Sequence, residues 1–274
     1  MRAVRSCVTI VVLMLVGLAG PVGSLAGPAA GQPAAETPAP KAAAEEVDLL
    51  LVLAADVSRS VDDRKFQLQR DGYAAAIMDE RVLAAIKSGL IGRIAICYVE
   101  WSGVGNQKTV IDWTVIGDRD SAGRFAGQLV ESARAFADRT SIAGGIDFAM
   151  TRIAAAPFSA RRHTIDVSGD GTNNSGREVT QARDEAVAKG AAINGIVILT
   201  EKPLSWNAEH TNPAGGLDGY YRANVIGGPG AFVMVAENFE SSGQALVAKL
   251  IAEIAGRDPV PPENPPPGRR LAVR

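Results

Sequence analysis

Apolar runs recur along the chain, and the first of them ends abruptly in a polar loop. It covers residues 49–55 and is followed by Asp56, Ser58 and Ser60. A near-continuous apolar run predicts a strand buried on both faces, as in a parallel sheet. Residues 61–66 then open a helix. The three polar side chains are therefore expected at the carboxyl end of a strand, where open α/β sheets bind their ligands.

Strand and helix patterns alternate through the rest of the chain. The alternating pattern at 108–115 predicts a half-exposed strand, paired with 94–101 as an antiparallel hairpin at the sheet edge. The whole order predicts an α/β fold: a doubly wound, mostly parallel sheet with one antiparallel edge strand and helices on both faces. Further strands are expected at 163–168, 191–199 and 231–235, and helical stripes at 66–77, 81–88, 125–133, 142–153, 175–189 and 246–254.

The two ends of the chain differ from its middle. Residues 1–26 carry two arginines, a short apolar core and a small-residue stretch, which predict a secretory signal peptide. Residues 27–46 form an Ala/Pro-rich linker and residues 256–274 a Pro-rich tail, leaving 47–255 as one domain. We expect an exported bacterial protein, periplasmic or secreted, with no stable membrane insertion of the mature chain.

Charge and composition narrow the classes of partner. Removing residues 1–26 takes away two arginines and no acid, which leaves 26 basic against 30 acidic residues and a net charge of −4. The basic residues are scattered, which excludes nucleic acid as the expected partner. Cys97 is then the only cysteine, so no internal disulfide forms. Two histidines and one cysteine are too few for a common structural zinc site.

The chemistry of the first loop is open to two interpretations. One carboxylate and two hydroxyls are hard oxygen ligands, which suit Mg²⁺, Mn²⁺ or Ca²⁺. Equally, Ser60 followed by Asp63 resembles a capping box, and Asp56 and Ser58 are common turn residues. Three oxygens do not complete an octahedral shell, so further ligands have to come from elsewhere in the chain.

Two other loops supply such candidates. Thr140 stands at the entry of the helix at 142–153, where a plain helix cap is the alternative role. Asp170 follows the strand at 163–168, where an Asp-Gly turn is the alternative. In a doubly wound sheet these loops share one edge with Asp56, Ser58 and Ser60, so five oxygen-bearing residues are expected to converge.

This arrangement resembles the von Willebrand factor type A (vWA) domain and its metal-ion-dependent adhesion site, or MIDAS. The resemblance covers about residues 47–255. It is carried by the D-x-S-x-S motif at Asp56, Ser58 and Ser60, by Thr140, and by Asp170 within Ser168-Gly169-Asp170-Gly171. The chain is more closely similar to a family of uncharacterised bacterial exported proteins of this fold. That likeness rests on residues 167–174 and on residues 224–230.

The resemblance implies a set of roles around a divalent cation, Mg²⁺ first. Ser58 and Ser60 would coordinate it through their hydroxyls, and Thr140 directly or through water. Asp56 and Asp170 would act mostly through bound water or supporting hydrogen bonds. An ion without a direct carboxylate ligand from its own chain would seek an acidic group on a protein partner. The complete set favours a metal site over separate turn and cap roles.

A binding module without catalytic residues is therefore the expected function. The alternatives are a divalent-metal-dependent phosphoester hydrolase with Asp56 as nucleophile, and a vWA scaffold whose site is empty. Asp56 does follow a strand, as aspartyl-phosphate chemistry requires. However, position 58 is serine rather than a second acid, and the pattern places no convincing general-base histidine or phosphate-binding lysine beside it.

Two features do not fit a simple copy of the fold. Asp166 lies inside the apolar strand at 163–168, and Asn194 lies inside the neighbouring strand; we expect the two side chains to be hydrogen-bonded, because an unpaired buried carboxylate is costly. The irregular segment 200–230 follows a strand's carboxyl end and is rich in aromatic residues. It is expected either to rise beside the metal face or simply to cover the core.

Overall fold

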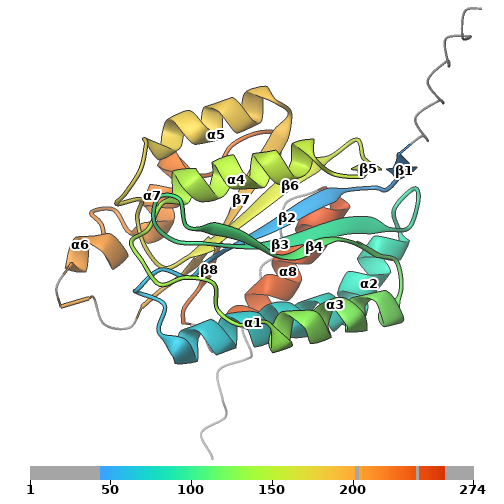
Figure 1. Cartoon of the computed structure of the whole chain (residues 1–274), viewed down its shortest axis with the longest axis horizontal. Helices are drawn as coiled ribbons and strands as arrows, with labels where there is room; N and C mark the ends of the chain where they lie inside the picture. Colours follow the sequence, from blue (N-terminus) through green and yellow to red (C-terminus); the bar gives the residue numbers. More distant parts are fainter. Residues whose placement is uncertain (1–43, 201–203, 206, 239–240, 257–274) are drawn as a thin grey trace, which may run out of the picture. The chain divides into compact units, whose positions relative to one another are not determined.

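The central sheet of the computed structural model has six strands in the order β4-β3-β2-β6-β7-β8 (Figure 1). The structure describes residues 44–200, 204–205, 207–238 and 241–256. All neighbouring strands are parallel except β3 and β4, which form the antiparallel edge pair. The predicted fold class is confirmed. The strands are β2 (Leu50–Asp56), β3 (Ile94–Trp101), β4 (Gln107–Ile116), β6 (His163–Gly169), β7 (Ala191–Ile198) and β8 (Val233–Ala236).

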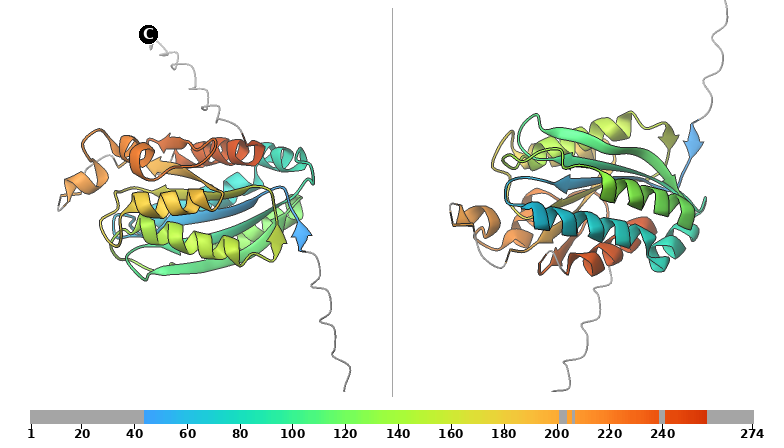
Figure 2. Two further views of the ribbon diagram at one scale, coloured as in Figure 1. Left: turned by 90° about the horizontal axis from the view of Figure 1, so that it is seen from above. Right: turned by 60° about the horizontal axis from the view of Figure 1, so that its bottom comes forward.

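Helices cover both faces of this sheet, and in Figure 2 they form a layer on each side. Because side chains alternate along a strand, Leu51 and Leu53 of β2 enter one core while Val52 and Ala54 enter the other. One layer contains α1 (Asp63–Met78), α2 (Glu80–Lys87), α3 (Arg119–Glu131) and α8 (Ser242–Ala255). The opposite layer contains α4 (Ile142–Ala154), α5 (Val179–Ala188) and α7 (Leu217–Asn224).

Three short elements complete the described part. The strands β1 (Glu45–Glu46) and β5 (Phe158–Ser159) pair in parallel, so the last two residues of the predicted linker form a strand. The helix α6 (Ala208–Thr211) is a single turn between β7 and α7. The predicted signal peptide and nearly all of the predicted tail lie outside the described residues. No helix within the described ranges is long and apolar enough to cross a membrane.

Two predicted helices differ in their bounds. The helix α3 ends at Glu131, before Ala133. At this end the buried Arg70 guanidinium donates to the carbonyls of Leu129 and Ser132, which satisfies carbonyls that the helix leaves without a partner. The helix α5 begins at Val179 rather than at 175, because residues 172–175 bond to other loops instead of starting the helix. Both differences leave extended loops next to the predicted site.

The buried polar residues of β6 and β7 have partners that the sequence did not suggest. Asp166 and Asn194 are neighbours in the sheet register, but they are not hydrogen-bonded to each other, so that expectation is wrong. Asp166 pairs with the Lys249 ammonium of α8 at 2.7 Å, and Asn194 donates to Glu253 at 3.0 Å. A fully buried lysine on α8 supplies the counter-charge that a buried carboxylate requires.

Candidate functional site

The loops after β2 and β6 meet through a chain of short hydrogen bonds. The Ser58 backbone N–H donates to Asp56 Oδ1 at 2.7 Å, and the hydroxyls of Ser58 and Ser60 are 3.0 Å apart. The Ser60 hydroxyl then donates to Asp170 Oδ1 at 2.5 Å. All four residues are buried. Four of the five predicted site residues are therefore directly connected, at the end of the sheet near α6 and α7 (Figure 1).

The loop after β2 is held in place by Arg134, from the extended segment between α3 and α4. One guanidinium nitrogen donates to the carbonyls of Val57, Ser58 and Val61 at 2.7, 2.9 and 2.7 Å. These bonds satisfy three backbone carbonyls of the loop. The positive charge of Arg134 also lowers the pKa of Asp56, against the larger effect of burial.

Neither Ser60 nor Thr140 caps a helix, so these two alternative roles are wrong. The N-cap of α1 is Asp62, whose side chain accepts from the Lys65 backbone N–H at 2.9 Å. The N-cap of α4 is Ser141, whose hydroxyl accepts from the Gly144 N–H. In each case a residue next to the helix performs the capping, which leaves the hydroxyls of Ser60 and Thr140 for the sheet edge.

Thr140 lies beside the loop after β6 and is held there from two sides. Its backbone N–H donates to Asn174 Oδ1 at 2.9 Å, and its carbonyl accepts from the Asn174 N–H at 2.9 Å. Its hydroxyl lies 3.2 Å from Nε2 of His210. Among the described residues, no hydrogen bond joins Thr140 to the other four predicted residues. Burial lowers the pKa of the His210 imidazole below its ordinary value, and the nearby Asp170 charge opposes this shift.

The two carboxylates of the site are in different electrostatic situations. Burial, and then the Asp170 charge, raise the pKa of Asp56 to about 8, although the Ser58 hydrogen bonds and Arg134 oppose this. No donor in the described part of the chain reaches Asp56 Oδ2. Asp170 instead has an ion pair, with the Lys65 ammonium 3.2 Å from its Oδ2. The site thus contains an orphaned buried carboxylate oxygen, which a cation would satisfy.

Lys65, Arg134 and His210 belong to this site, and sequence reasoning missed all three. Lys65 lies in the first turn of α1. Its short sequence separation from the polar loop is the one feature of the sequence that could have indicated its role. His210 lies in the irregular segment 200–230, and its ring packs against Gly171, where a Cβ atom would lie 2.2 Å from Nε2. That glycine is a weak sequence signal of a close approach. No sequence pattern around Arg134 indicates that it contacts the loop after β2.

The donor set fits a hard divalent cation. The neutral hydroxyls of Ser58, Ser60 and Thr140 and the orphaned Asp56 oxygen are oxygen ligands of the kind that Mg²⁺ and Mn²⁺ accept. The described residues contain no group of three or more histidines, cysteines, aspartates or glutamates that would bind a metal by itself. Any ion here would therefore depend on hydroxyl ligands and on ligands from outside the chain.

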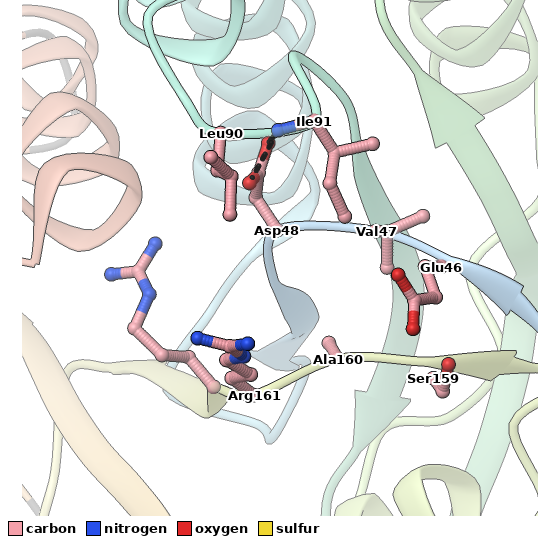
Figure 3. A pocket seen from close by; sticks show the side chains of 9 residues that line it. Glu46, Val47, Asp48, Leu90, Ile91, Ser159, Ala160 and Arg161 are labelled. Carbon is pink, nitrogen blue, oxygen red and sulfur yellow. Dashed lines mark hydrogen bonds between the residues drawn. The ribbon is translucent and has the colours of Figure 1, made fainter.

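Surface hollows occur at the opposite end of the sheet. One of about 480 Å³ is lined by Leu90, Ile91, Arg161 and Arg162, with Asp48 between them (Figure 3). The Asp48 carboxylate accepts hydrogen bonds from the N–H groups of Ile91 and Gly92 at 2.9 and 2.8 Å. Because its carboxylate is satisfied by backbone groups, this hollow lacks the unsatisfied ligands found at the carboxyl end of β2.

Solved structures with a similar fold include proteins from animals and bacteria. Proximal thread matrix protein 1 from the mussel byssus matches with a TM-score of 0.53 and 14% identity, covering 77% of this chain and 49% of the mussel chain. Another structure of that protein is described as having a zinc-occupied MIDAS motif, with a TM-score of 0.52 and 15% identity at the same coverage. This chain thus spans about half the length of the mussel protein.

Two bacterial surface proteins share the fold as well. The pilus adhesin SpaC from Lactobacillus rhamnosus GG matches with a TM-score of 0.54 and 11% identity, covering 77% of this chain and 31% of the adhesin. The minor pilin PilB from Streptococcus sanguinis matches with a TM-score of 0.53 and 12% identity, covering 77% and 62%. At these identities the likeness shows the fold alone.

Comparison at the level of sequence families gives a direct assignment. No curated protein matches the chain. Residues 46–258 match the family model described as "Protein of unknown function (DUF1194)". The chain therefore belongs to the DUF1194 family, and its described part has a vWA-like fold.

Proposed function

We propose that this protein is an exported binding module that captures an acidic group of a protein partner through a divalent metal ion. The ion is held by Ser58, Ser60 and Thr140, with Asp56 and Asp170 balancing its charge. The observation that supports this proposal is the hydrogen-bond chain that joins the side chains of Ser58, Ser60 and Asp170 at one sheet edge, while other residues perform the capping of both helices. Oxygen ligands alone favour Mg²⁺, with Mn²⁺ or Ca²⁺ as alternatives.

The charge balance supports an acidic ligand. Two carboxylates, Asp56 and Asp170, face two cations, Lys65 and Arg134. The four groups cancel when all are ionised, so a divalent ion would give the site a net positive charge. An anionic ligand would reduce this charge from +2 to +1 in a buried environment where an uncompensated charge is costly. A carboxylate on a partner protein supplies such a ligand.

The similar structures support a role in binding. They include a pilus adhesin, a minor pilin and a matrix protein described with a zinc-occupied MIDAS motif. Against hydrolysis, Asp56 is fully buried, and the pKa of about 8 keeps it protonated at neutral pH in the absence of metal. A nucleophilic carboxylate has to be ionised and accessible.

The proposal is tested by pull-down from the exported fraction of the source organism. Wild type, Ser58→Ala and Ser121→Ala are compared with and without EDTA, and with free glutamate as a competing carboxylate. Ser121 is a buried serine in the cap of α3, at the opposite end of the sheet, and serves as the matched control. We expect partners that are lost with EDTA, with glutamate and with Ser58→Ala, but retained with Ser121→Ala. Capture indifferent to EDTA and to Ser58→Ala would exclude metal-mediated binding.

A further inference from the structure

His210 reaches the candidate metal site from the segment between β7 and β8. Only 3% of the residue is exposed, although it comes from a single-turn helix whose first two residues are exposed. Its Nε2 atom lies 3.2 Å from the Thr140 hydroxyl. The D-x-S-x-S motif, Thr140 and Asp170 account for the oxygen ligands of the site and leave this nitrogen without a role.

Three contacts fix the imidazole in this position. The His210 carbonyl accepts a hydrogen bond of 2.9 Å from the Thr172 N–H, which joins the two backbones. The ring packs on Gly171, where any larger residue would collide with Nε2 and Cε1. The Thr172 hydroxyl lies 3.2 Å from Nδ1. The ring is therefore fixed at both nitrogens and along its face, as an oriented ligand has to be.

The spacing of the polar atoms matches the edge of a coordination shell. Metal–ligand bonds of about 2.0–2.1 Å put neighbouring ligand atoms about 2.9 Å apart in an octahedron and about 3.3 Å apart in a tetrahedron. The observed separations are 3.2 Å between Thr140 Oγ1 and His210 Nε2, and 3.0 Å between the hydroxyls of Ser58 and Ser60. Both separations are hydrogen-bond distances in the metal-free protein, and both fall within the range of adjacent ligands.

We propose that His210 Nε2 is a ligand of the metal ion and shifts the preference of the site from Mg²⁺ towards Zn²⁺, Co²⁺ and Mn²⁺. The inference rests on the proposed metal site. Imidazole is a good ligand for zinc and cobalt and a poor one for Mg²⁺, which prefers oxygen and keeps its water. Metal binding at Nε2 requires the ring proton on Nδ1, where the Thr172 hydroxyl, 3.2 Å away, accepts it. The Asn174 amide nitrogen lies 3.4 Å from the same Nδ1 atom and makes no hydrogen bond with it in this tautomer.

Nitrogen NMR tests the coordination directly, because the chain has only two histidines. His163 lies at the start of β6, at the opposite end of the sheet, and serves as the internal control. With ¹⁵N-labelled histidine in the full chain, we expect zinc to shift the Nε2 resonance of His210 and to leave His163 unchanged. A zinc-bound protein whose two histidines keep their metal-free resonances would overturn the inference.

Affinity ratios test the selectivity. Gln at position 210 keeps a hydrogen-bonding group near Thr140 but supplies no imidazole. We expect His210→Gln to lower the affinity for Zn²⁺ and Co²⁺ by about tenfold or more and to change the affinity for Mg²⁺ little. Gly171→Ala, which displaces the ring without removing it, is expected to have the same effect, and His163→Gln none. The change in the ratio of zinc to magnesium affinity is the evidence, because most sites with nitrogen and oxygen ligands bind zinc tightly in any case.

The outcomes separate this inference from the proposed function. If wild type binds metal and Ser58→Ala abolishes binding, but His210→Gln lowers zinc and magnesium affinity equally, then His210 only supports the fold and the inference fails while the metal site stands. If wild type shows no metal binding by calorimetry with Zn²⁺, Mn²⁺ or Mg²⁺, the metal site itself fails, and the inference with it.

Discussion

The Ser60 hydroxyl donates to Asp170 Oδ1 at 2.5 Å, across 110 residues of sequence. The two residues follow β2 and β6, which are neighbours in the sheet, so the bond joins two adjacent strand ends. The second oxygen of Asp170 faces the Lys65 ammonium. In the metal-free protein Asp170 is therefore neutralised by the chain itself, and a metal ion has to compete with that lysine.

Replacing Lys65 with methionine is expected to change metal-free stability and metal affinity in opposite directions. Asp170 is fully buried and loses its counter-charge, so we expect the free energy of unfolding in EDTA to fall by about 1–3 kcal/mol. Mg²⁺ affinity should rise, because the ion no longer competes with the ammonium. Denaturation and calorimetric titration measure the two quantities. Lys87→Met, on the exposed last turn of α2, is the control, and a fall in both quantities would contradict this account.

Thr140 and Ser141 are expected to have separate roles although they are neighbours. Ser141→Ala removes the N-cap of α4 and should cost about 1 kcal/mol with and without metal. Thr140→Val keeps the volume and the helix but removes the hydroxyl, so it should reduce the metal-induced rise in the unfolding midpoint. Thermal melts with EDTA and with Mn²⁺ distinguish the two. If Ser141→Ala, and not Thr140→Val, loses the metal-induced rise in the unfolding midpoint, the assignment of these two roles is wrong.

The cluster of Lys249, Asp166 and Glu253 is expected to depend on its one cation. Lys249→Met leaves buried carboxylates without a counter-charge and should cost about 3–5 kcal/mol. Adding Asp166→Asn removes one of those charges, so the double variant should be more stable than Lys249→Met alone. Urea denaturation measures both. If the losses of stability from Lys249→Met and Asp166→Asn simply add in the double variant, the ion pair does not couple Lys249 with Asp166.

Glu253 gives a pH dependence of known sign. Burial raises its pKa from 4.5 to about 7, with Lys249 opposing this shift and Asp166 adding to it. The folded protein therefore binds more protons than the unfolded chain between these values. The stabilisation is fully present below pH of about 4.5 and is lost as the pH rises through about 7.

Glu253→Gln cannot titrate, so its stability should fall less steeply between pH 5 and 8. Urea denaturation in EDTA across this range gives the two slopes. Asp56 titrates in the same direction in both proteins, so the difference between the slopes belongs to Glu253 and its partners. Equal slopes would mean that Glu253 keeps its ordinary pKa.

Periodicity was sufficient to predict the sheet, because its strands bury side chains on both faces. The run at 49–55 is apolar since Leu51 and Leu53 face one core while Val52 and Ala54 face the other. The same reasoning found the edge strand β4, whose residues are more exposed than those of the fully buried β3. The predicted alternation is not kept along it, because the pairing with β3 contains register shifts. Neither conclusion required a contact between distant residues.

Side-chain partners could not be predicted in this way. Local sequence suggested Ser60 as a cap, but Asp62 is closer to the helix start and takes that role. The prediction paired Asp166 with Asn194 because the two lie on neighbouring strands. The observed partner of Asp166 is Lys249, which lies on α8, far away in the sequence. Likewise His210 reaches Thr140 only through the path of the segment after β7. Such pairings depend on tertiary packing, which no spacing rule contains.

Thermal melting with and without metal tests the central claim most directly. A ligand of the folded state stabilises it by about 2.7 kcal/mol at a hundred times its dissociation constant. We predict that Mg²⁺ or Mn²⁺ raises the midpoint of wild type and of Ser121→Ala above their values in EDTA, and leaves that of Ser58→Ala unchanged. Equal midpoints with metal and EDTA in wild type, or a rise in Ser58→Ala as large as in wild type, would contradict a metal site at this sheet edge.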